Sequence, residues 1–145
     1  MAAILIVEDD KNQRLLLEEE FTAEGYTTIT VASGTEALAV LERTMPDLIV
    51  LDIAMPGVDG LDLMGRLLGL NNRLPVVIHT AYSSYQDNFM SWAADAYVIK
   101  QSNLAELKGT VRSILGKAEG PPKQRPGFLP PKREKGLASE PQQVS

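Results

Sequence analysis

A chain of 145 residues fits a single domain, and its 44% hydrophobic and 23% charged residues are ordinary proportions for a globular protein. The absence of cysteine excludes disulfides, thiol catalysis and Cys-ligated zinc. Of the net charge of −5, residues 1–116 contribute −8 and residues 117–145 contribute +3, so the larger part lacks the basic face that nucleic-acid binding requires.

Within residues 1–116, five apolar runs alternate with five helical patterns. The runs lie at 3–7, 27–31, 47–51, 75–79 and 96–99, and the helical patterns lie at about 11–24, 34–44, 60–70, 83–93 and 103–116. Five such units predict an α/β fold, in which helices cover both faces of a five-stranded parallel sheet. In a flavodoxin-like (βα)5 sandwich, with strand order 2-1-3-4-5, the third strand is central.

Polar residues mark the starts of several helices. Ser33, with Glu36 three residues later, is a capping-box signature for the second helix. Asp59 and Asn103 are candidate caps for the third and fifth helices.

We expect neither an export signal at the start of the chain nor an output domain at its end. No basic leader precedes the first apolar run, and no run approaches the roughly 20 residues of a membrane helix, so a cytoplasmic protein is the simplest interpretation. Residues 117–145 hold six of the nine prolines and six lysines or arginines, which predicts a disordered tail or the remnant of a linker. The domain is therefore expected to span residues 1–116.

Charged and hydroxyl side chains stand at the carboxyl ends of four predicted strands. Glu8 and Asp9 follow the first strand, Asp52 follows the third, and Thr80 and Lys100 stand at the ends of the fourth and fifth. Because parallel neighbours end on the same side, and ligands of open α/β sheets bind beyond the strand ends, these side chains are expected to share one pocket. Asp52 would lie between the two acids and the other two groups.

Three carboxylates in one pocket need neutralisation, because two unit charges 4 Å apart repel by about 4 kcal/mol at an effective dielectric of 20. Either one carboxyl stays protonated, or a hard cation such as Mg²⁺ lies among the oxygens. Mg²⁺ would also shield an incoming phosphoryl group, so Mg²⁺-dependent phosphorylation of Asp52 follows as the natural chemistry. Lys100 would pair first with Asp52 and then with a phosphoryl oxygen, and Thr80 would donate to another oxygen.

Each residue also has an ordinary structural explanation. Acids at 8–10 suit the positive end of a helix, Asp52 can begin a turn, and threonine and lysine are common in such places. Their coincidence at four strand ends favours a functional site. His79, the single histidine, is instead expected to be a satisfied residue of the sheet that points away from the pocket.

The segments around these residues resemble the receiver domain of bacterial two-component response regulators, the CheY-like family. The resemblance covers residues 1 to about 116 and rests on ILIVEDD at 4–10, LDIAMPGVDG at 51–60, HTA at 79–81 and AYVIK at 96–100. It implies that Asp52 accepts a phosphoryl group from a sensor histidine kinase or a phosphotransfer protein. The implied site comprises Asp9, Asp52, the Ala54 carbonyl and, through water, Glu8 for Mg²⁺, with Thr80 and Lys100 for the phosphate.

The resemblance also implies an output. Phosphorylation would draw the Thr80 hydroxyl inward and bury Tyr97, reshaping the face formed by residues 83–93, 96–99 and 103–116 to control an unknown output protein. A half-buried strand tyrosine explains Tyr97 equally well from the sequence. We expect no direct contact with nucleic acid or membrane, and a monomer or a phosphorylation-dependent dimer.

Two other functions compete. A Mg²⁺-dependent phosphatase with an aspartyl nucleophile needs a second acid two residues later, where this chain has Ala54. A constitutive protein-interaction module with a vestigial acidic pocket is the alternative. The complete polar set argues against it, but Gln101, where the family commonly has a proline in a cis peptide after the lysine, keeps it open. A cis bond without proline costs about 3 to 4 kcal/mol, so Lys100–Gln101 is expected to be trans or strained.

Overall fold

The computed structural model describes residues 2–54, 60–70, 73–81 and 94–117. Its strands are β1 (Ala3–Val7), β2 (Thr27–Val31), β3 (Leu48–Leu51), β4 (Val76–Thr80) and β5 (Ala96–Ile99), and its helices are α1 (Lys11–Ala23), α2 (Gly34–Arg43), α3 (Gly60–Leu70) and α4 (Ala105–Lys117). These elements agree with the predicted ones to within two residues at each end. The predicted helix at 83–93, the candidate cap Asp59 and the tail after residue 117 lie outside the described residues.

The five strands form one parallel sheet of order β2-β1-β3-β4-β5, which confirms the predicted fold. Val7 of β1 pairs with Leu51 of β3, and Leu51 in turn lies opposite Ile78 of β4. The carboxyl ends of these strands therefore reach the same edge of the sheet, with β3 in the middle.

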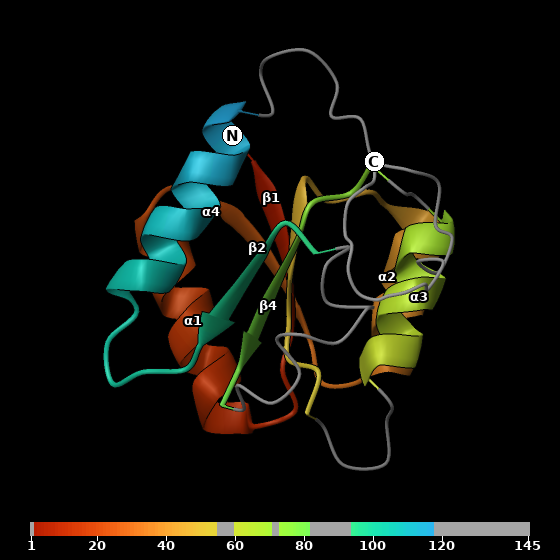
Figure 1. Ribbon diagram of the computed structural model, residues 1–145, viewed down its shortest axis with the longest axis horizontal. Coiled ribbons are helices and arrows are strands. Elements are labelled where there is room, and N and C mark those ends of the chain that lie inside the picture. Colours follow the sequence, from red (N-terminus) through yellow and green to blue (C-terminus); the bar gives the residue numbers. More distant parts are fainter. Residues whose placement is uncertain (1, 55–59, 71–72, 82–93, 118–145) are drawn as a thin grey trace, which may run out of the picture.

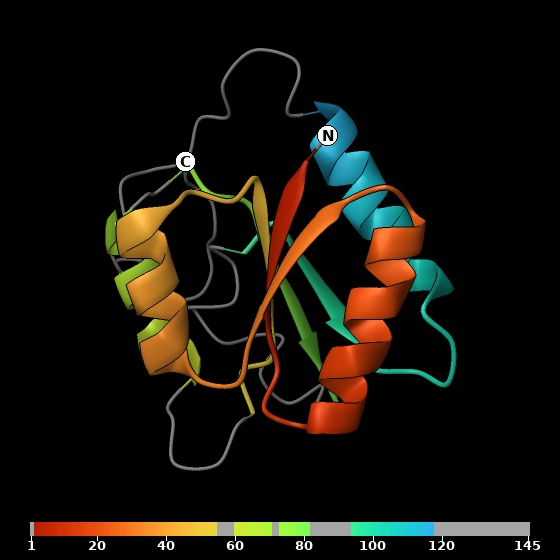
Figure 2. The same cartoon turned by 180° about the vertical axis from the view of Figure 1, so that it is seen from behind.

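Helices cover both faces of the sheet. Figure 1 shows α1 and α4 on one side and α2 and α3 on the other, and Figure 2 shows the same layers from behind. Alternate strand residues enter two separate cores: Leu5 and Ile49 pack towards α2 and α3, whereas Ile6 and Val50 pack with Leu17 and other apolar residues of α1 and α4. This two-sided burial explains why the strands are continuous apolar runs. Among the helices that the structure describes, none is long and apolar enough to cross a membrane.

Side-chain caps fix where the helices begin. Ser33 Oγ accepts the N–H of Glu36 at 3.2 Å, and the Glu36 carboxylate accepts the N–H of Ala32 at 3.0 Å, which confirms the predicted cap of α2. The Asn103 side chain accepts the N–H of Ala105 at 3.0 Å, as expected of a cap. The last helix therefore starts at Ala105 and not at residue 103, where the predicted helical pattern starts. Asp10 caps α1, so one member of the acidic cluster at 8–10 does serve a helix end.

Replacing Ser33 with Ala should lower the free energy of unfolding by about 1 kcal/mol, because the Glu36 N–H loses its acceptor. Urea denaturation followed by circular dichroism measures the change. Ser113, exposed within α4, is the matched control, and S113A should change the free energy by less than about 0.5 kcal/mol. An unchanged S33A, or an equal loss in both variants, would contradict the role assigned to this cap.

Candidate functional site

Backbone hydrogen bonds place the site residues one step beyond the strands. The N–H of Asp52 donates to the carbonyl of Val7 at 3.1 Å, and the N–H of Lys100 donates to the carbonyl of Thr80 at 2.7 Å. The ladder thus continues past the last strand residues. The positions of these side chains are fixed by the sheet itself and not by a loop.

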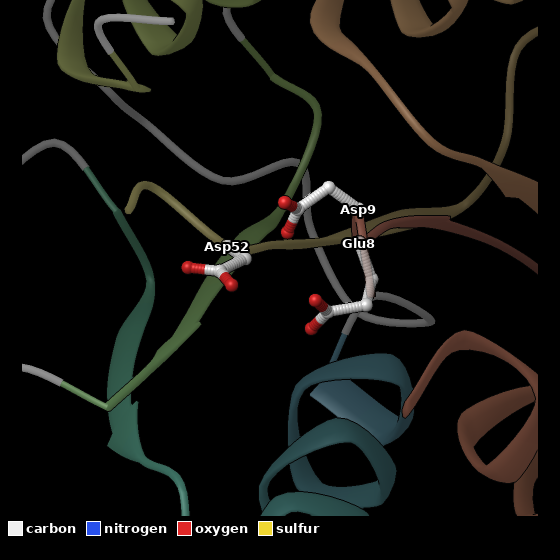
Figure 3. Close-up of side chains that lie close together, drawn as sticks. All are labelled: Glu8, Asp9 and Asp52. Carbon is white, nitrogen blue, oxygen red and sulfur yellow. The ribbon is translucent and has the colours of Figure 1, made fainter. Parts of the chain in front are cut away.

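Three carboxylates meet at this edge. Glu8, Asp9 and Asp52 each offer an oxygen, and these oxygens lie within 4.8 Å of one another. Glu8 and Asp52 are buried, with 1% and 5% of their surface exposed, while Asp9 is exposed. Figure 3 shows the carboxylates of Glu8 and Asp9 on the side of the chain that faces Asp52. The three acids that were expected to lie together therefore form one cluster.

Lys100 joins two of these acids. Its Nζ donates to Glu8 Oε1 and to Asp52 Oδ2, both at 2.9 Å. The contact with Asp52 was expected from the sequence, whereas the contact with Glu8 was not. All peptide bonds of the described residues are trans, including that between Lys100 and Gln101, and the Gln101 amide donates to Glu106 at 2.9 Å.

Burial and pairing act against each other in this cluster. Burial raises the pKa of Glu8 above its ordinary value of 4.5, although the hydrogen bonds from Lys100 and from the Asp10 N–H lower it. Burial lowers the pKa of Lys100, but the hydrogen bonds and charges of Asp52 and Glu8 outweigh it and raise the pKa above 10.5. Lys100 is therefore a fixed positive charge at neutral pH.

The donor set fits a hard divalent cation. Both Glu8 oxygens are engaged, Oε1 by Lys100 and Oε2 by the Asp10 N–H, so Glu8 suits a contact through water. The Asp9 carboxylate accepts no hydrogen bond from any described residue and is open to solvent. Asp52 Oδ1 accepts the Ala54 N–H at 2.9 Å, which brings this carboxylate beside the Ala54 peptide. Oxygen ligands of this kind, completed by water, are those that Mg²⁺ takes.

Two further residues of the predicted site lie on neighbouring strands. Thr80 ends β4, is fully buried, and lies opposite Ile99 of β5. Tyr97 of β5 is half-buried and packs against the core cluster on the α2 and α3 side. The structure thus gives Tyr97 an environment between the exposed and buried extremes.

Arg14 contacts the acid pair but was missed by the sequence analysis. Its Nη1 donates to the carbonyl of Glu8 at 2.9 Å and to that of Asp9 at 3.3 Å. The available signal was a basic residue near the amino end of a helix, where the helix dipole disfavours positive charge.

His79 differs from its expected state. It follows Val77 on the α1 and α4 face and lies beside Asp52 in the register of β3 and β4, so it does not turn away from the pocket region. It is 5% exposed, and no group of the described residues forms a hydrogen bond with its Nδ1, so the expectation of a satisfied histidine was wrong for this atom. Burial, together with the charge of Lys100, lowers the pKa of His79 to about 4, against the opposing effect of Asp52.

Fold and site together define an α/β protein with an acidic, lysine-bridged pocket at the carboxyl edge of its central strands. Residues 4–112 match the response regulator receiver domain. The chain therefore belongs to this family, which confirms the resemblance seen in the sequence.

Individual relatives agree. Sporulation initiation phosphotransferase F of Bacillus subtilis is 33% identical over 114 residues, 77% of this chain and 92% of that protein. The response regulator TrrA of Thermotoga maritima, solved in complex with Mg²⁺–BeF, is 42% identical with a TM-score of 0.75, covering 79% of this chain and 99% of TrrA. A structure of TrrA in complex with histidine kinase ThkA gives 43% identity and a TM-score of 0.74 over the same shares. The chain spans about half the length of the transcriptional regulators it matches, such as 53% of AfsQ1 of Streptomyces coelicolor.

Stability should fall between pH 6.5 and pH 4 because of His79. The unfolded chain takes up a proton on this histidine near pH 6.5, whereas the folded chain does so only near pH 4, so the unfolded state binds more protons in this window. The loss is complete below pH 4 and amounts to about 3 kcal/mol. Urea denaturation of the wild type and H79Q at intervals from pH 7.5 to pH 4.5 measures it. H79Q should lack this contribution, and parallel pH profiles of the two proteins would refute it.

Proposed function

We propose that this chain is a phosphorylation-activated signalling switch in which Asp52 accepts a phosphoryl group from a sensor histidine kinase or a phosphotransfer protein. The observation that carries the proposal is the position of Asp52. Its buried carboxylate is bonded to Lys100 and lies within 4.8 Å of two further acids at the edge where α/β proteins bind ligands.

Asp52 is the nucleophile in the proposed reaction. One of its oxygens attacks phosphorus in line with the leaving group, so the bond from phosphorus to the donor nitrogen breaks as the new P–O bond forms. Asp9, Asp52 and the Ala54 carbonyl would hold Mg²⁺, with Glu8 acting through water, and a bound ion would supply positive charge to the phosphoryl oxygens. The Lys100 ammonium holds Oδ2 of the Asp52 carboxylate at 2.9 Å and so helps to orient it for the attack.

Lys100 and Thr80 would contact the phosphoryl group once Asp52 carries it. The Lys100 ammonium already contacts Asp52 and would exchange this carboxylate oxygen for a phosphoryl oxygen. Thr80, at the end of the adjacent strand, would donate its hydroxyl to another oxygen. The proposed chain is a phosphoacceptor that assists its own phosphorylation and dephosphorylation, and it is not an enzyme acting on other substrates. Ala54, two residues beyond Asp52, leaves water an approach, whereas the bulky Tyr82, two residues beyond Thr80, would screen it, so these two residues do not fix the phosphoryl lifetime.

The output of the switch is proposed to be a change in surface shape. Inward movement of the Thr80 hydroxyl would make room for Tyr97, which is half-buried, to become fully buried. Because β5 carries Tyr97 and leads directly to Lys100, the change would be transmitted to the surface of β5 and α4. The predicted helix at 83–93, which the family resemblance adds to this face, lies outside the described residues. A phosphoryl group shifts this equilibrium only if it binds the two arrangements with different affinity.

Two structures of TrrA support the proposed phosphoryl donor and the proposed metal ion. A kinase complex of TrrA supports a histidine kinase as donor, and Mg²⁺–BeF in TrrA supports Mg²⁺ as cofactor. An output protein of unknown identity would bind the surface that this change reshapes. The chain itself is proposed to be a monomer or a phosphorylation-dependent dimer. We propose that residues 1–116 suffice as the receiver domain. A constitutive interaction module with a vestigial pocket fits less well. Such a module would bind no metal ion, so it would have no use for the exposed Asp9 carboxylate beside the two buried acids.

Incubation with acetyl phosphate and Mg²⁺ should add one phosphoryl mass to the intact protein. D52N should show no adduct, because an amide oxygen is a poor nucleophile, and wild type without Mg²⁺ should show at least tenfold less. D62N, which removes an exposed acid paired with Arg66 on α3, is the matched control and should react like wild type. Intact-mass spectrometry reads all four samples. An adduct that survives in D52N would rule out Asp52 as the acceptor.

A further inference from the structure

The carboxylates of Glu8 and Asp9 come from consecutive residues, yet both reach the same cluster. In an extended strand, successive side chains point to opposite faces and successive carbonyls point to opposite sides. Residues 8 and 9 therefore need a change of backbone direction directly after β1, so that two neighbouring acids can serve one site.

Arg14 occupies the position where this change can be held. The carbonyls of Glu8 and Asp9 converge on the same Arg14 nitrogen, at 2.9 and 3.3 Å, as they could not in a regular strand. Arg14 is half-buried and belongs to the first turns of α1, where its own N–H donates to the Asp10 carbonyl at 2.8 Å. A rigid, planar donor group anchored on a helix thus reaches back to the two peptide groups that carry the acid pair.

Asp10 completes the same turn from the other side. Its N–H donates to Glu8 Oε2 at 3.1 Å, and its carboxylate caps α1 through the N–H groups of Asn12 and Gln13. Asp10 thereby orients the Glu8 side chain, whereas among the described residues only Arg14 donates a hydrogen bond to the carbonyl of Asp9. The orientation of Asp9, the exposed acid, depends most on Arg14.

We propose that Arg14 is a positioning residue of the metal site: its guanidinium fixes the turn at residues 8 and 9 so that both carboxylates face Asp52. The inference rests on the proposed function, since it concerns the same Mg²⁺ site. Outer-shell groups that orient metal ligands typically change metal affinity by about 10- to 100-fold when removed.

The sign of the effect distinguishes positioning from charge. A positive side chain near a cation site repels the cation, so removal of Arg14 would strengthen Mg²⁺ binding if its charge were all that mattered. If Arg14 positions the acids, removal weakens Mg²⁺ binding in spite of the lost repulsion. The two explanations therefore predict opposite changes in the dissociation constant.

The test is a titration of the full ¹⁵N-labelled chain with MgCl₂, followed by the amide signals of residues 8–10 and 52. R14M, which keeps an aliphatic stem, should bind Mg²⁺ about tenfold more weakly than wild type, and R14K, which keeps the charge but not the fork, should also lose several-fold. R43M is the matched control, because Arg43 is exposed on α2 and donates to the carbonyl of Ala39 at 3.2 Å, and it should bind like wild type. Thermal unfolding checks that each variant is folded. If R14M does not fold, the Mg²⁺ affinity of R14K decides the test.

Equal or tighter Mg²⁺ binding by R14M, or wild-type binding by R14K, would overturn the inference. Phosphorylation of R14M by acetyl phosphate should return to within about twofold of the wild-type rate at saturating Mg²⁺. A rate that stays low at saturation would also overturn it, because the defect would not act through the metal ligands. If the wild type shows no saturable Mg²⁺ binding, the proposed function itself is defeated. If the wild type binds Mg²⁺ and R14M binds it with the same affinity, only this inference is defeated.

Discussion

Two buried carboxylates, Glu8 and Asp52, share the ammonium group of Lys100, and the remainder of the site is arranged around this triad. Without the lysine, two negative charges would face each other where little water reaches them. Loss of one partner from a buried pair typically costs about 3–5 kcal/mol, because the other charge remains buried and unpaired. The triad also leaves the third acid, Asp9, with no positive partner among the described residues, and a negative charge without a counter-charge attracts cations.

The parallel sheet makes this triad possible. Glu8, Asp52 and Lys100 come from strands that are not consecutive in the chain, and they meet because β1, β3 and β5 all end at one edge. In an antiparallel arrangement the same residues would alternate between the two edges. The apolar runs that build the strands therefore serve the chemistry indirectly, because their pairing register sets which polar residues lie side by side.

Much of this arrangement was predictable from the sequence. Runs such as residues 3–7 and 47–51 are apolar without alternation, which identifies buried parallel strands, and the acids and lysine directly after such runs identify the edge where they meet. Three features were not predictable: the contact of Lys100 with Glu8, the contacts of Arg14 with two carbonyls, and the lack of a partner for His79 Nδ1 among the described residues. Each depends on a side-chain direction or a backbone turn at a strand end, where the periodicity on which sequence analysis relies no longer applies.

The separation of the triad along the chain has a consequence for biosynthesis. Lys100 lies 92 residues after Glu8 and 48 after Asp52, and it follows the edge strand that is made last. During synthesis, Glu8 and Asp52 therefore have no such counter-charge until residue 100 has left the exit tunnel. Since domains fold as units during synthesis, the pocket is completed only when nearly the whole domain has emerged.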